Sequence, residues 1–203
     1  MPRPYIVGFG GTASGLSSTE RALQIALAAA ERYGADTMMF GGDYLTRLPH
    51  YLTGDRSTAA ISVFVDAIRA ADGIIIASPG YHASISGLVK NAIDYVEETA
   101  KDQRIYLDGV PVGLIATAHG WQATSGTLAT LRSIVHALRG WPTPLGAAIN
   151  SAGRVFKDGL CTDEAVVRQL ELVGRQVQEF AQRKLKDAWV TGATAPVASP
   201  LPD

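Results

Sequence analysis

The sequence predicts an α/β fold, a three-layer sandwich in which helices cover both faces of a five-stranded parallel sheet of strand order 2-1-3-4-5. Short apolar runs alternate with longer amphipathic stretches along the 203 residues. The apolar runs are continuous, as in residues 73–78, which is expected of strands buried on both faces. A helix between successive strands supplies the crossover that parallel strands require.

The boundaries of the elements follow from this alternation. Apolar runs predict strands over residues 5–8, 35–40, 73–78, 110–117 and 144–150. Amphipathic spacing predicts helices over about 19–33, 58–71, 87–99, 126–138 and 162–187. Gly34 stands where a left-handed cap would end the first helix. The stretch 41–57 is predicted to be a long surface connection, and 79–86 and 119–124 are predicted to be loops. No repeat or boundary interrupts the pattern, so we expect one domain over residues 1–187 and a poorly ordered tail over 188–203.

The composition excludes several classes of protein. The 18 Lys and Arg residues nearly balance the 19 Asp and Glu residues, and a formal net charge of −1 does not fit a nucleic-acid binder. A hydrophobic content of 47% excludes disorder of most of the chain. No apolar run approaches the roughly 20 residues of a membrane span, and the first residues lack the apolar region of a signal peptide. The single cysteine, Cys161, excludes an intramolecular disulfide and a multi-cysteine metal site. We therefore expect a cytoplasmic protein without a metal, a nucleic-acid partner or a membrane partner.

The first of three candidate binding loops follows the first strand. In an open α/β sheet, ligands bind beyond the carboxyl ends of the strands, where the strand order reverses. This loop combines three glycines with five hydroxyl side chains just before a helix, so backbone N–H groups, hydroxyls and the helix dipole can bind a phosphate. The hydroxyl residues are Thr12, Ser14, Ser17, Ser18 and Thr19. Ser17 also has capping-box spacing to Glu20, which gives Ser17 an alternative role as a helix cap.

The standard phosphate motifs do not describe this loop. It lacks the Gly-Lys-Ser/Thr ending of a P-loop. Ala13 occupies the third glycine position of the dinucleotide fingerprint G-x-G-x-x-G.

The second and third loops follow the third and fourth strands. Pro79 and Gly80 form a turn whose backbone amides can bind the edge of a flat heterocycle, and Tyr81 and His82 can pack against its plane. The alternatives are a half-buried aromatic at Tyr81 and an exposed turn residue at His82. In the third loop, His119 has no carboxylate at a spacing that would orient it as a base, so a surface histidine is the favoured interpretation.

These loops resemble those of the NAD(P)H-dependent FMN reductase family, which has a flavodoxin-like fold. Residues 78–94, SPGYHASISGLVKNAID, are similar to the family segment S-P-x-Y-x-x-S-x-x-G-x-x-K-N-x-x-D. The first loop is similar to the family's G-S-x-R-x-x-S-x-N, which holds the FMN phosphate. Ser14 replaces the arginine, and Thr19 stands at the asparagine. The third loop keeps only Gly120 of the usual Gly-Gly pair. The resemblance covers roughly residues 4–180.

The resemblance implies an oxidoreductase that moves a hydride from NADPH or NADH to FMN, with no catalytic acid or base. It implies FMN-phosphate contacts from the five hydroxyl residues of the first loop. It implies ring contacts from Pro79, Gly80, Tyr81, His82 and Ser84, and contacts to the far edge of the ring from Thr117, Ala118, His119 and Gly120. Some members release reduced flavin to a partner monooxygenase. A quinone or azo reductase with bound FMN is the alternative enzyme. A flavodoxin-type electron carrier is the alternative of another class, and the net charge of −1 argues against it.

Apolar residues on two of the predicted helices bear on assembly. A face directed to the sheet needs only about 100° of a helix. Additional apolar residues therefore suggest a second buried surface and predict a homodimer, or a tetramer of paired dimers, with its interface beside the flavin site. These residues are Ile93, Leu131, Ile134, Val135 and Leu138. The alternative is that they fill a large core.

Overall fold

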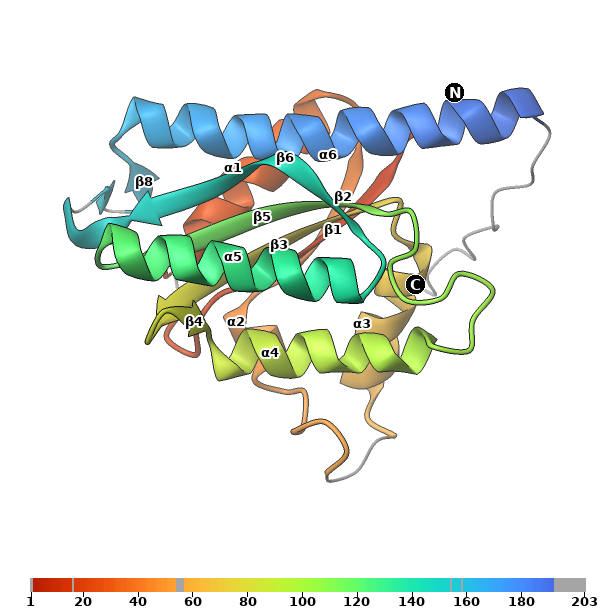
Figure 1. Cartoon of the computed structure of the whole chain (residues 1–203), viewed down its shortest axis with the longest axis horizontal. Coiled ribbons are helices and arrows are strands. Elements are labelled where there is room, and N and C mark those ends of the chain that lie inside the picture. The colour runs from red at the N-terminus through yellow and green to blue at the C-terminus, as the bar shows by residue number, and fades with distance from the viewer. Residues whose placement is uncertain (1, 16, 54–56, 154, 158, 192–203) are drawn as a thin grey trace.

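A parallel sheet lies at the centre of the computed structural model, which describes residues 2–15, 17–53, 57–153, 155–157 and 159–191 (Figure 1). The order of its long strands is β2-β1-β3-β5-β6, and all neighbouring pairs are parallel. In chain order this is the predicted order 2-1-3-4-5. The long strands are β1 Tyr5–Gly10, β2 Asp36–Phe40, β3 Gly73–Tyr81, β5 Pro111–Ala118 and β6 Trp141–Asn150.

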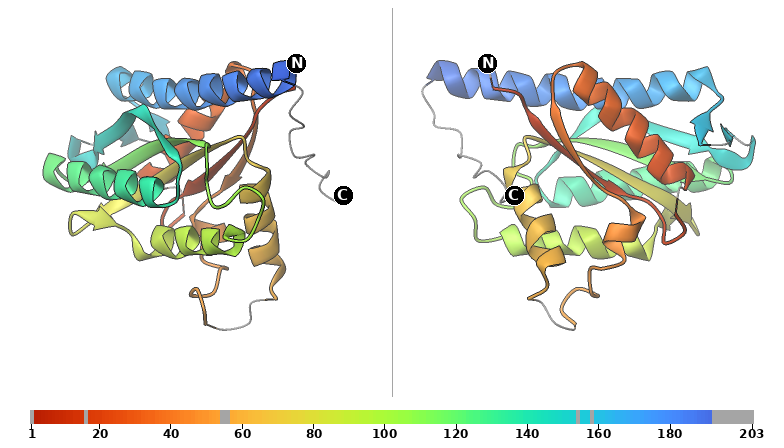
Figure 2. Two further views of the ribbon diagram at one scale, coloured as in Figure 1. Left: turned by 45° about the vertical axis from the view of Figure 1, so that its right-hand side comes forward. Right: turned by 180° about the vertical axis from the view of Figure 1, so that it is seen from behind.

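Helices cover both faces of this sheet (Figures 1 and 2). Helices α1 Ser18–Arg32 and α6 Glu164–Thr191 lie on one face, and α3 Ala59–Ala70, α4 Gly87–Asp94 and α5 Trp121–Ala137 lie on the other. On the first face, a Cβ on Gly174 would lie 1.9 Å from the Ala26 carbonyl oxygen, so glycine lets α6 approach α1. On the second face, Phe64 packs edge-on against Phe9 and Phe40. The central sheet is therefore buried on both sides, as the continuous apolar runs predict.

Several short elements were not expected from the sequence. Helix α2 lies within the predicted connection, a β3–β4 hairpin replaces the predicted loop 79–86, and a second hairpin precedes α6. The third predicted helix ends as a 3-10 turn rather than as α-helix. These elements are α2 Gly42–Leu45, β4 Ser84–Ile85, η1 Tyr95–Thr99, η2 Ser151–Gly153, β7 Phe156–Lys157 and β8 Leu160–Cys161.

Two helix boundaries also differ from the predictions. Helix α5 begins at Trp121 instead of residue 126, so most of the predicted loop 119–124 is helical. The side chains of that segment are mostly polar, so the segment has no apolar periodicity from which a helix could be predicted. Within the helix, the Thr124 hydroxyl donates to the Trp121 carbonyl oxygen at 2.9 Å. Helix α6 continues to Thr191, beyond the predicted end at 187. The rest of the predicted tail, residues 192–203, lies outside the described residues.

The apolar residues behind the predicted second surface belong to the core. Ile93, Leu131 and Val135 are buried, and Ile134 and Leu138 pack against the same cluster. The alternative explanation, a large core, therefore accounts for them. They no longer argue for a homodimer or tetramer, whose existence stays a prediction.

Strand β6 forms one edge of the sheet and contains a bulge. Its pairing with β5 shifts register between Val112 and Leu114, opposite residues 143–145. Polar side chains meet the bulged backbone: Arg132 donates to the Pro144 carbonyl oxygen at 3.2 Å, and the Leu145 N–H donates to Gln176 Oε1 at 3.0 Å. Pro142 and Pro144 have no N–H to offer. Among the described helices, none is long and apolar enough to cross a membrane.

Candidate functional site

The three candidate loops meet at the carboxyl edge of the sheet. Gly10, which ends β1, has φ 149°, and a Cβ there would lie 1.9 Å from the Ala77 carbonyl oxygen of β3. The hydroxyls of Thr19 and Thr117 lie 2.5 Å apart and join the start of α1 to the end of β5. A Cβ on Gly80 would lie 3.0 Å from the Ala118 Cβ, so β3 and β5 also end side by side.

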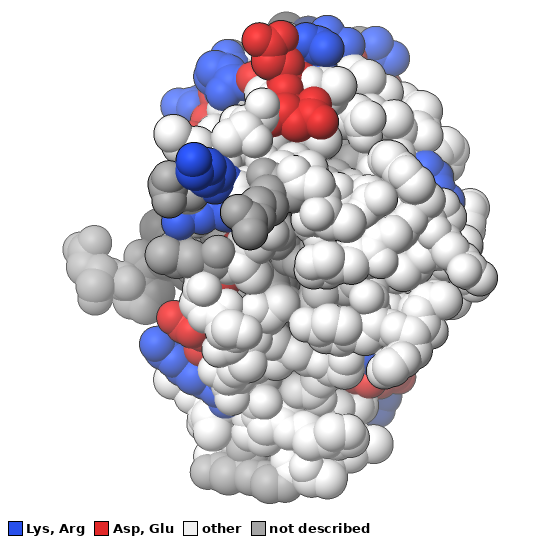
Figure 3. Space-filling model, turned by 90° about the vertical axis from the view of Figure 1, so that its left-hand side faces the viewer, with Lys and Arg blue, Asp and Glu red and all other residues white. Residues whose placement is uncertain are grey.

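The surface of this edge carries little charge. Figure 3 views the left-hand end of Figure 1, where β3 and β6 finish, and uncharged residues form the centre of that face while charged residues lie toward its margins. Residues 10–19, 73–89 and 109–131 contain no Lys, Arg, Asp or Glu. The described residues contain no cluster of three or more His, Cys, Asp or Glu side chains that could hold a metal ion.

The hydroxyl residues of the first loop take different positions. Ser14 is exposed, and Thr12 and Ser18 are half-buried. The Thr12 hydroxyl donates to the Ser14 carbonyl oxygen at 2.8 Å. Thr19 is only 2% exposed, and its hydroxyl bonds with Thr117. The Thr19 hydroxyl therefore has its partner inside the protein.

Ser17 caps helix α1, as the alternative interpretation of its spacing states. Its Oγ accepts a hydrogen bond from the Glu20 N–H at 3.3 Å. The bond uses a lone pair of the hydroxyl, so the hydroxyl proton can still be donated to a ligand. Capping and phosphate binding are therefore compatible at Ser17.

The fit of this loop to a phosphate rests on neutral groups. The first N–H groups of α1 have no partner within the helix, and the helix dipole places partial positive charge there. A Cβ on Gly15 would meet nothing within 4 Å, so there is room beside the loop. Behind the loop, Glu20 Oε1 accepts from the Gly42 N–H at 3.2 Å, and Oε2 is buried with no partner among the described residues. The loop thus has the donors and the space for a phosphate but holds a carboxylate behind it.

The second loop is a tight hairpin with an unfavourable backbone. Gly80 pairs with Ile85 and Tyr81 with Ser84, which leaves His82 and Ala83 as a two-residue turn. Both have positive φ, 51° and 61°, as a type I′ turn requires. Such turns favour Asn-Gly because other residues are strained there. The hairpin exposes His82 and leaves the Tyr81 side chain 53% exposed. Pro79 is buried within β3.

Helix α5 supports this hairpin from behind. Thr127 Oγ1 shares its proton between the Ala123 carbonyl oxygen of its own helix at 2.8 Å and the Ser84 carbonyl oxygen at 3.1 Å. A Cβ on Gly126 would lie 2.8 Å from the Ala83 carbonyl oxygen, so the turn packs directly on the helix. Sequence reasoning missed both positioning residues. The available signal was Gly126 itself, which stands at the start of the predicted helix 126–138 and lies inside α5.

Other residues of the matched motif hold the scaffold together. Ser78 Oγ accepts from the Ser86 N–H at 3.1 Å, and Ser86 Oγ in turn caps α4 by accepting from the Val89 N–H at 3.2 Å. Lys90 and Asp94 form an exposed ion pair at 2.5 Å. The part of the motif that faces the site is therefore the hairpin and not the helix that follows it.

Asn91 of the same motif anchors the connection between β2 and α3. Its Oδ1 accepts from the Tyr51 N–H at 2.8 Å, and its Nδ2 donates to the Pro49 carbonyl oxygen at 2.9 Å. The Tyr95 hydroxyl donates to the same carbonyl at 2.8 Å. The sequence offered no sign of this role.

The third loop brings two of its predicted residues to the surface. His119 is exposed, whereas Thr117 and Ala118 are 4% and 6% exposed. Gly120 has φ 120°, and a Cβ there would meet nothing within 4 Å. Its N–H donates to Asn150 Oδ1 at 3.0 Å, so Asn150, which sequence reasoning missed, ties the ends of β5 and β6 together.

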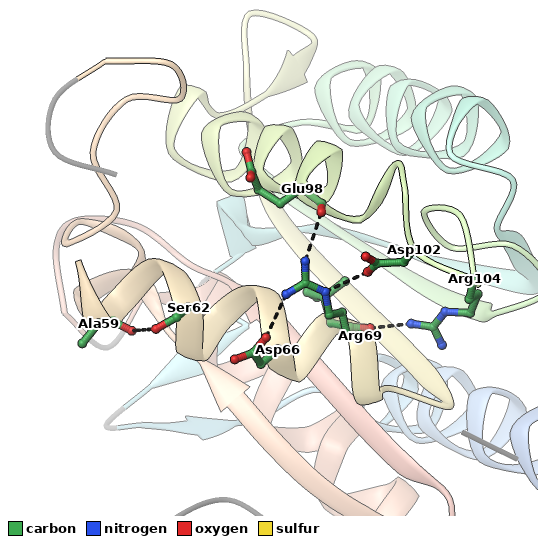
Figure 4. Close-up of polar contacts among 8 residues, drawn as sticks. Ala59, Ser62, Asp66, Arg69, Glu98, Asp102 and Arg104 are labelled. Atoms are coloured by element: carbon green, nitrogen blue, oxygen red, sulfur yellow. Dashed lines mark hydrogen bonds and ion pairs between the residues drawn. The ribbon is translucent and has the colours of Figure 1, made fainter. Parts of the chain in front are cut away.

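The other polar features of the molecule lie away from these loops. Near the amino ends of the strands, Arg69 binds Asp102 at 2.7 Å and Asp66 at 2.9 Å (Figure 4). Arg104 donates to the Ala71 carbonyl oxygen at 2.6 Å. Burial raises the pKa of the Asp72 carboxyl and lowers the pKa values of Arg104 and Lys184. These contacts fasten α3 to the segment before β5.

Two shallow cavities also lie outside the loops. One, of about 280 Å³, lies between α1, α6 and the β7–β8 hairpin. The other, of about 210 Å³, lies between α3 and η1. Of the described residues that line them, none is a predicted site residue.

The parallel sheet and its strand order define a flavodoxin-like fold, and the hydroxyl-rich loop and a tight hairpin lie at the carboxyl edge of its sheet. The chain belongs to the NADPH-dependent FMN reductase family, whose model matches residues 4–153. FMN and a reduced nicotinamide nucleotide are the cofactor and electron donor that this family implies.

Comparisons with individual proteins agree with this family. The chain is similar to an FMN-dependent NADPH-azoreductase of Staphylococcus haemolyticus, with 34% identity over 98 residues, which is 48% of each protein. Among solved structures, an oxidoreductase from Corynebacterium diphtheriae superposes with a TM-score of 0.70 at 19% identity, covering 89% of this chain and 98% of that one. A flavodoxin, WrbA-like protein from Agrobacterium tumefaciens has a TM-score of 0.61 at 17% identity, covering 89% and 98%. The structural likeness shows the fold alone, and the chain spans about half the length of the curated relatives it matches.

Proposed function

We propose that the chain is an NAD(P)H-dependent FMN reductase that transfers a hydride from NADPH or NADH to FMN in the cytoplasm. The observation that carries this proposal is that the hydroxyl-rich start of α1 and the Tyr81–Ser84 hairpin lie at the same carboxyl edge of the sheet. FMN, when bound, supplies the acceptor chemistry at its ring. The protein has to hold the ring and the nicotinamide face to face, and a proton-carrying side chain is not needed for hydride transfer.

We assign the following roles to the site residues. Thr12, Ser14, Ser17 and Ser18 hold the phosphate together with the N–H groups of the first turn of α1. Tyr81, His82, Ser84 and the backbone of Gly80 lie along the ring, and His119 and Gly120 lie at its far edge. Thr19, Thr117 and Ala118 position these loops from inside the protein, and Pro79 does so within β3.

Weak retention of FMN follows from the electrostatics of the loop. No cationic side chain lies in residues 10–19, and the Glu20 carboxylate lies behind them. A phosphate is therefore held by neutral donors alone, which bind an anion less strongly than an arginine fork does. This favours an enzyme that treats FMN as a substrate and releases reduced flavin, with a flavin-dependent monooxygenase as its consumer.

Ser14 provides a test of the phosphate assignment. We expect Ser14→Ala to weaken FMN binding by about 1–3 kcal/mol, the range for a hydrogen bond to a charged group, and to leave riboflavin binding unchanged. Because Ser14 is exposed and does not cap the helix, stability should not change. Ser17→Ala is the matched variant, which should lose FMN affinity and also about 1 kcal/mol of stability through the cap. Equal losses for FMN and riboflavin in Ser14→Ala would overturn the assignment.

A quinone or azo reductase with retained FMN is the second candidate. It is favoured by the exposed aromatic side chains Tyr81 and Trp121 at this edge, and a similar protein is named as an azoreductase. Steady-state oxidation of NADPH and NADH with FMN, FAD and a quinone as acceptors separates the candidates. A colourless protein that oxidises NADPH only with added FMN supports the reductase. A yellow protein that reduces the quinone without added FMN supports the alternative, and a protein that does not oxidise either nucleotide would fit an electron carrier.

A further inference from the structure

The cavity of about 280 Å³ between α1, α6 and the β7–β8 hairpin lies outside the three candidate loops. Its walls come from two helices that pack together on one face of the sheet, as the right-hand view of Figure 2 shows, and from the hairpin turn at Gly159 and Leu160. Its volume is slightly below the roughly 300–1,000 Å³ of sites for drug-sized ligands. The cavity therefore suits a small molecule.

Arg21, near the start of α1, places a cation without a partner on the wall of this cavity. Its Nε is buried, and its guanidinium forms no hydrogen bond or ion pair with any residue that the structure describes. Buried donors of folded proteins normally have a partner, and a guanidinium carries five N–H donors. An anion in the cavity would supply the partner that Arg21 lacks.

The turn of the β7–β8 hairpin packs directly against the Arg21 guanidinium. A Cβ on Gly159 would lie 2.9 Å from Arg21 Nη2 and 3.1 Å from its Cζ. Gly159 has φ 82°, a conformation that other residues rarely adopt. Glycine at this position therefore both forms the turn and leaves room for the guanidinium, whose planar fork is held at the cavity before any ligand arrives.

The other walls are electrically balanced and largely apolar. Arg32 donates to Glu171 Oε1 at 2.5 Å, so these two charges offset each other. Among the described residues that line the cavity, Arg21 then carries the one charge without a partner. The apolar lining consists of Ile25, Ala28, Leu160 and Val167. An inorganic anion would not use this apolar surface, so charge and lining together favour an organic anion with a single charge.

We propose that this cavity is a binding site for a small organic monocarboxylate, with the carboxylate on Arg21 and the apolar body between α1, α6 and Leu160. The guanidinium fork matches the two oxygens of a carboxylate. The inference does not rest on the proposed flavin function, because none of the described lining residues belongs to the three candidate loops.

Calorimetric titration of the full chain with para-toluate tests the proposal. The matched probes are para-toluamide, which has the same shape without the charge, and acetate, which has the charge without the apolar body. We expect saturable binding of para-toluate and about tenfold weaker binding of each of the other two. Cys161 lines the cavity and is the single cysteine of the chain. Bound para-toluate should therefore slow alkylation of Cys161 by N-ethylmaleimide, which locates the binding.

Arg21→Gln should lower the affinity for para-toluate by about tenfold or more, because a hydrogen bond between two charged groups is lost. Arg21→Lys should lose less, since it keeps the charge but not the fork. Neither variant removes a hydrogen bond within the described part of the protein, so both should fold. Arg168→Gln is the control: this arginine follows Val167 in α6, its side chain is 67% exposed, and it does not line the cavity. It should bind para-toluate like the wild type.

Several outcomes would overturn the assignment. Equal affinities for para-toluate and para-toluamide would show that Arg21 does not bind a charge. Protection of Cys161 by inorganic phosphate at the same concentration would indicate a general anion site without use of the apolar lining. Equal losses in Arg21→Gln and Arg168→Gln would indicate a diffuse effect of surface charge. A loss of FMN affinity in Arg21→Gln with riboflavin binding unchanged would place Arg21 at the flavin phosphate instead.

Discussion

His82 and Ala83, at the tip of the β3–β4 hairpin, are the most unusual residues of the site at the level of the backbone. Both have left-handed φ values of 51° and 61°, and neither is glycine. Such conformations persist only where surrounding contacts over-determine them. Here the contacts come from α5, through Thr127 on the Ser84 carbonyl and the close approach of Gly126 to Ala83. The turn that presents Tyr81 is therefore held in shape at the expense of stability.

Replacing Ala83 with glycine should recover part of this strain. Left-handed backbone costs an L-residue roughly 1–2 kcal/mol, and glycine loses about 0.5–1 kcal/mol through its greater freedom when unfolded. We expect Ala83→Gly to raise the free energy of unfolding by about 0.5–1 kcal/mol, measured by urea denaturation. Ala100→Gly, at φ −62°, is the control and should lower it. A loss of stability in Ala83→Gly would mean that the methyl group contributes more by packing than it costs in strain.

The Thr19–Thr117 pair gives a second prediction at this scale. The two hydroxyls are buried and serve each other. Thr117→Val should cost about 1–3 kcal/mol because it leaves the Thr19 hydroxyl unpaired in the interior. The double variant Thr19→Val/Thr117→Val should regain much of this loss, as a double-mutant cycle by denaturation can show. Additive losses would indicate that the two hydroxyls act separately, for instance as ligands.

Burial explains why this pair could not be read from the sequence. Thr19 and Ser14 are both hydroxyl residues of one glycine-rich loop, and the sequence treats them alike. Thr19 is the buried one, and its hydroxyl pairs with that of Thr117, 98 positions away in the chain. Only the packed structure brings that partner into contact.

At the scale of elements, the long connection between β2 and α3 depends on the helical segment that follows the β3–β4 hairpin. Asn91 and Tyr95 bind its backbone at Pro49 and Tyr51. The connection has only a short helix of its own, and loops of this length are stable when packed by specific contacts. Asn91, a residue of the matched motif, therefore holds the backbone of Pro49 and Tyr51, which lie outside the motif.

We predict that Asn91→Ala loosens this connection. Loss of its hydrogen bonds to Tyr51 and Pro49 should lower stability by about 1–3 kcal/mol and speed limited proteolysis between residues 48 and 53. Lys90→Ala, at the neighbouring position, removes an exposed ion pair and should cost only about 0.3–0.5 kcal/mol without affecting cleavage. Unchanged proteolysis of Asn91→Ala would contradict the anchoring role.

The long elements could be predicted and the short ones could not, for a physical reason. The five parallel strands carry continuous apolar runs that are visible without knowledge of their partners. The two-residue strand β4 exists because it pairs with β3 and because Thr127 binds it from 43 positions away. Sequence periodicity cannot show an element whose stability comes from such contacts.

At the scale of the whole molecule, the two ends of the sheet differ in their electrostatics. The carboxyl edge, with the three candidate loops, has almost no charged side chains. The amino edge holds Asp72 near Arg104 and Lys184, and Asp72 Oδ2 accepts from the Tyr5 N–H at 2.9 Å. The candidate binding loops and the polar contacts around Asp72 therefore lie at opposite ends of the strands.

The half-buried Asp72 makes stability depend on pH in a defined direction. Burial raises the pKa of its carboxyl above the usual 3.8, against the lowering effects of the Tyr5 N–H, Arg104 and Lys184. The folded protein then binds this proton more tightly than the unfolded chain, so ionisation of Asp72 costs stability as pH rises through the folded pKa. We expect the stability of the wild type relative to Asp72→Asn to increase as pH falls from 7 toward about 4, measured by urea unfolding. The opposite slope would mean that the neighbouring cations dominate.

The unpaired outer side of β6 has a consequence for the protein at high concentration. The last strand of a sheet can recruit a strand from another molecule, which leads to aggregation. In the first half of β6, two prolines have no N–H group. The side chains of Arg132 and Gln176 form hydrogen bonds with the backbone of the bulge. A foreign strand would find no regular ladder there to extend. We therefore expect that the protein does not polymerise through the first half of β6, even at high concentration.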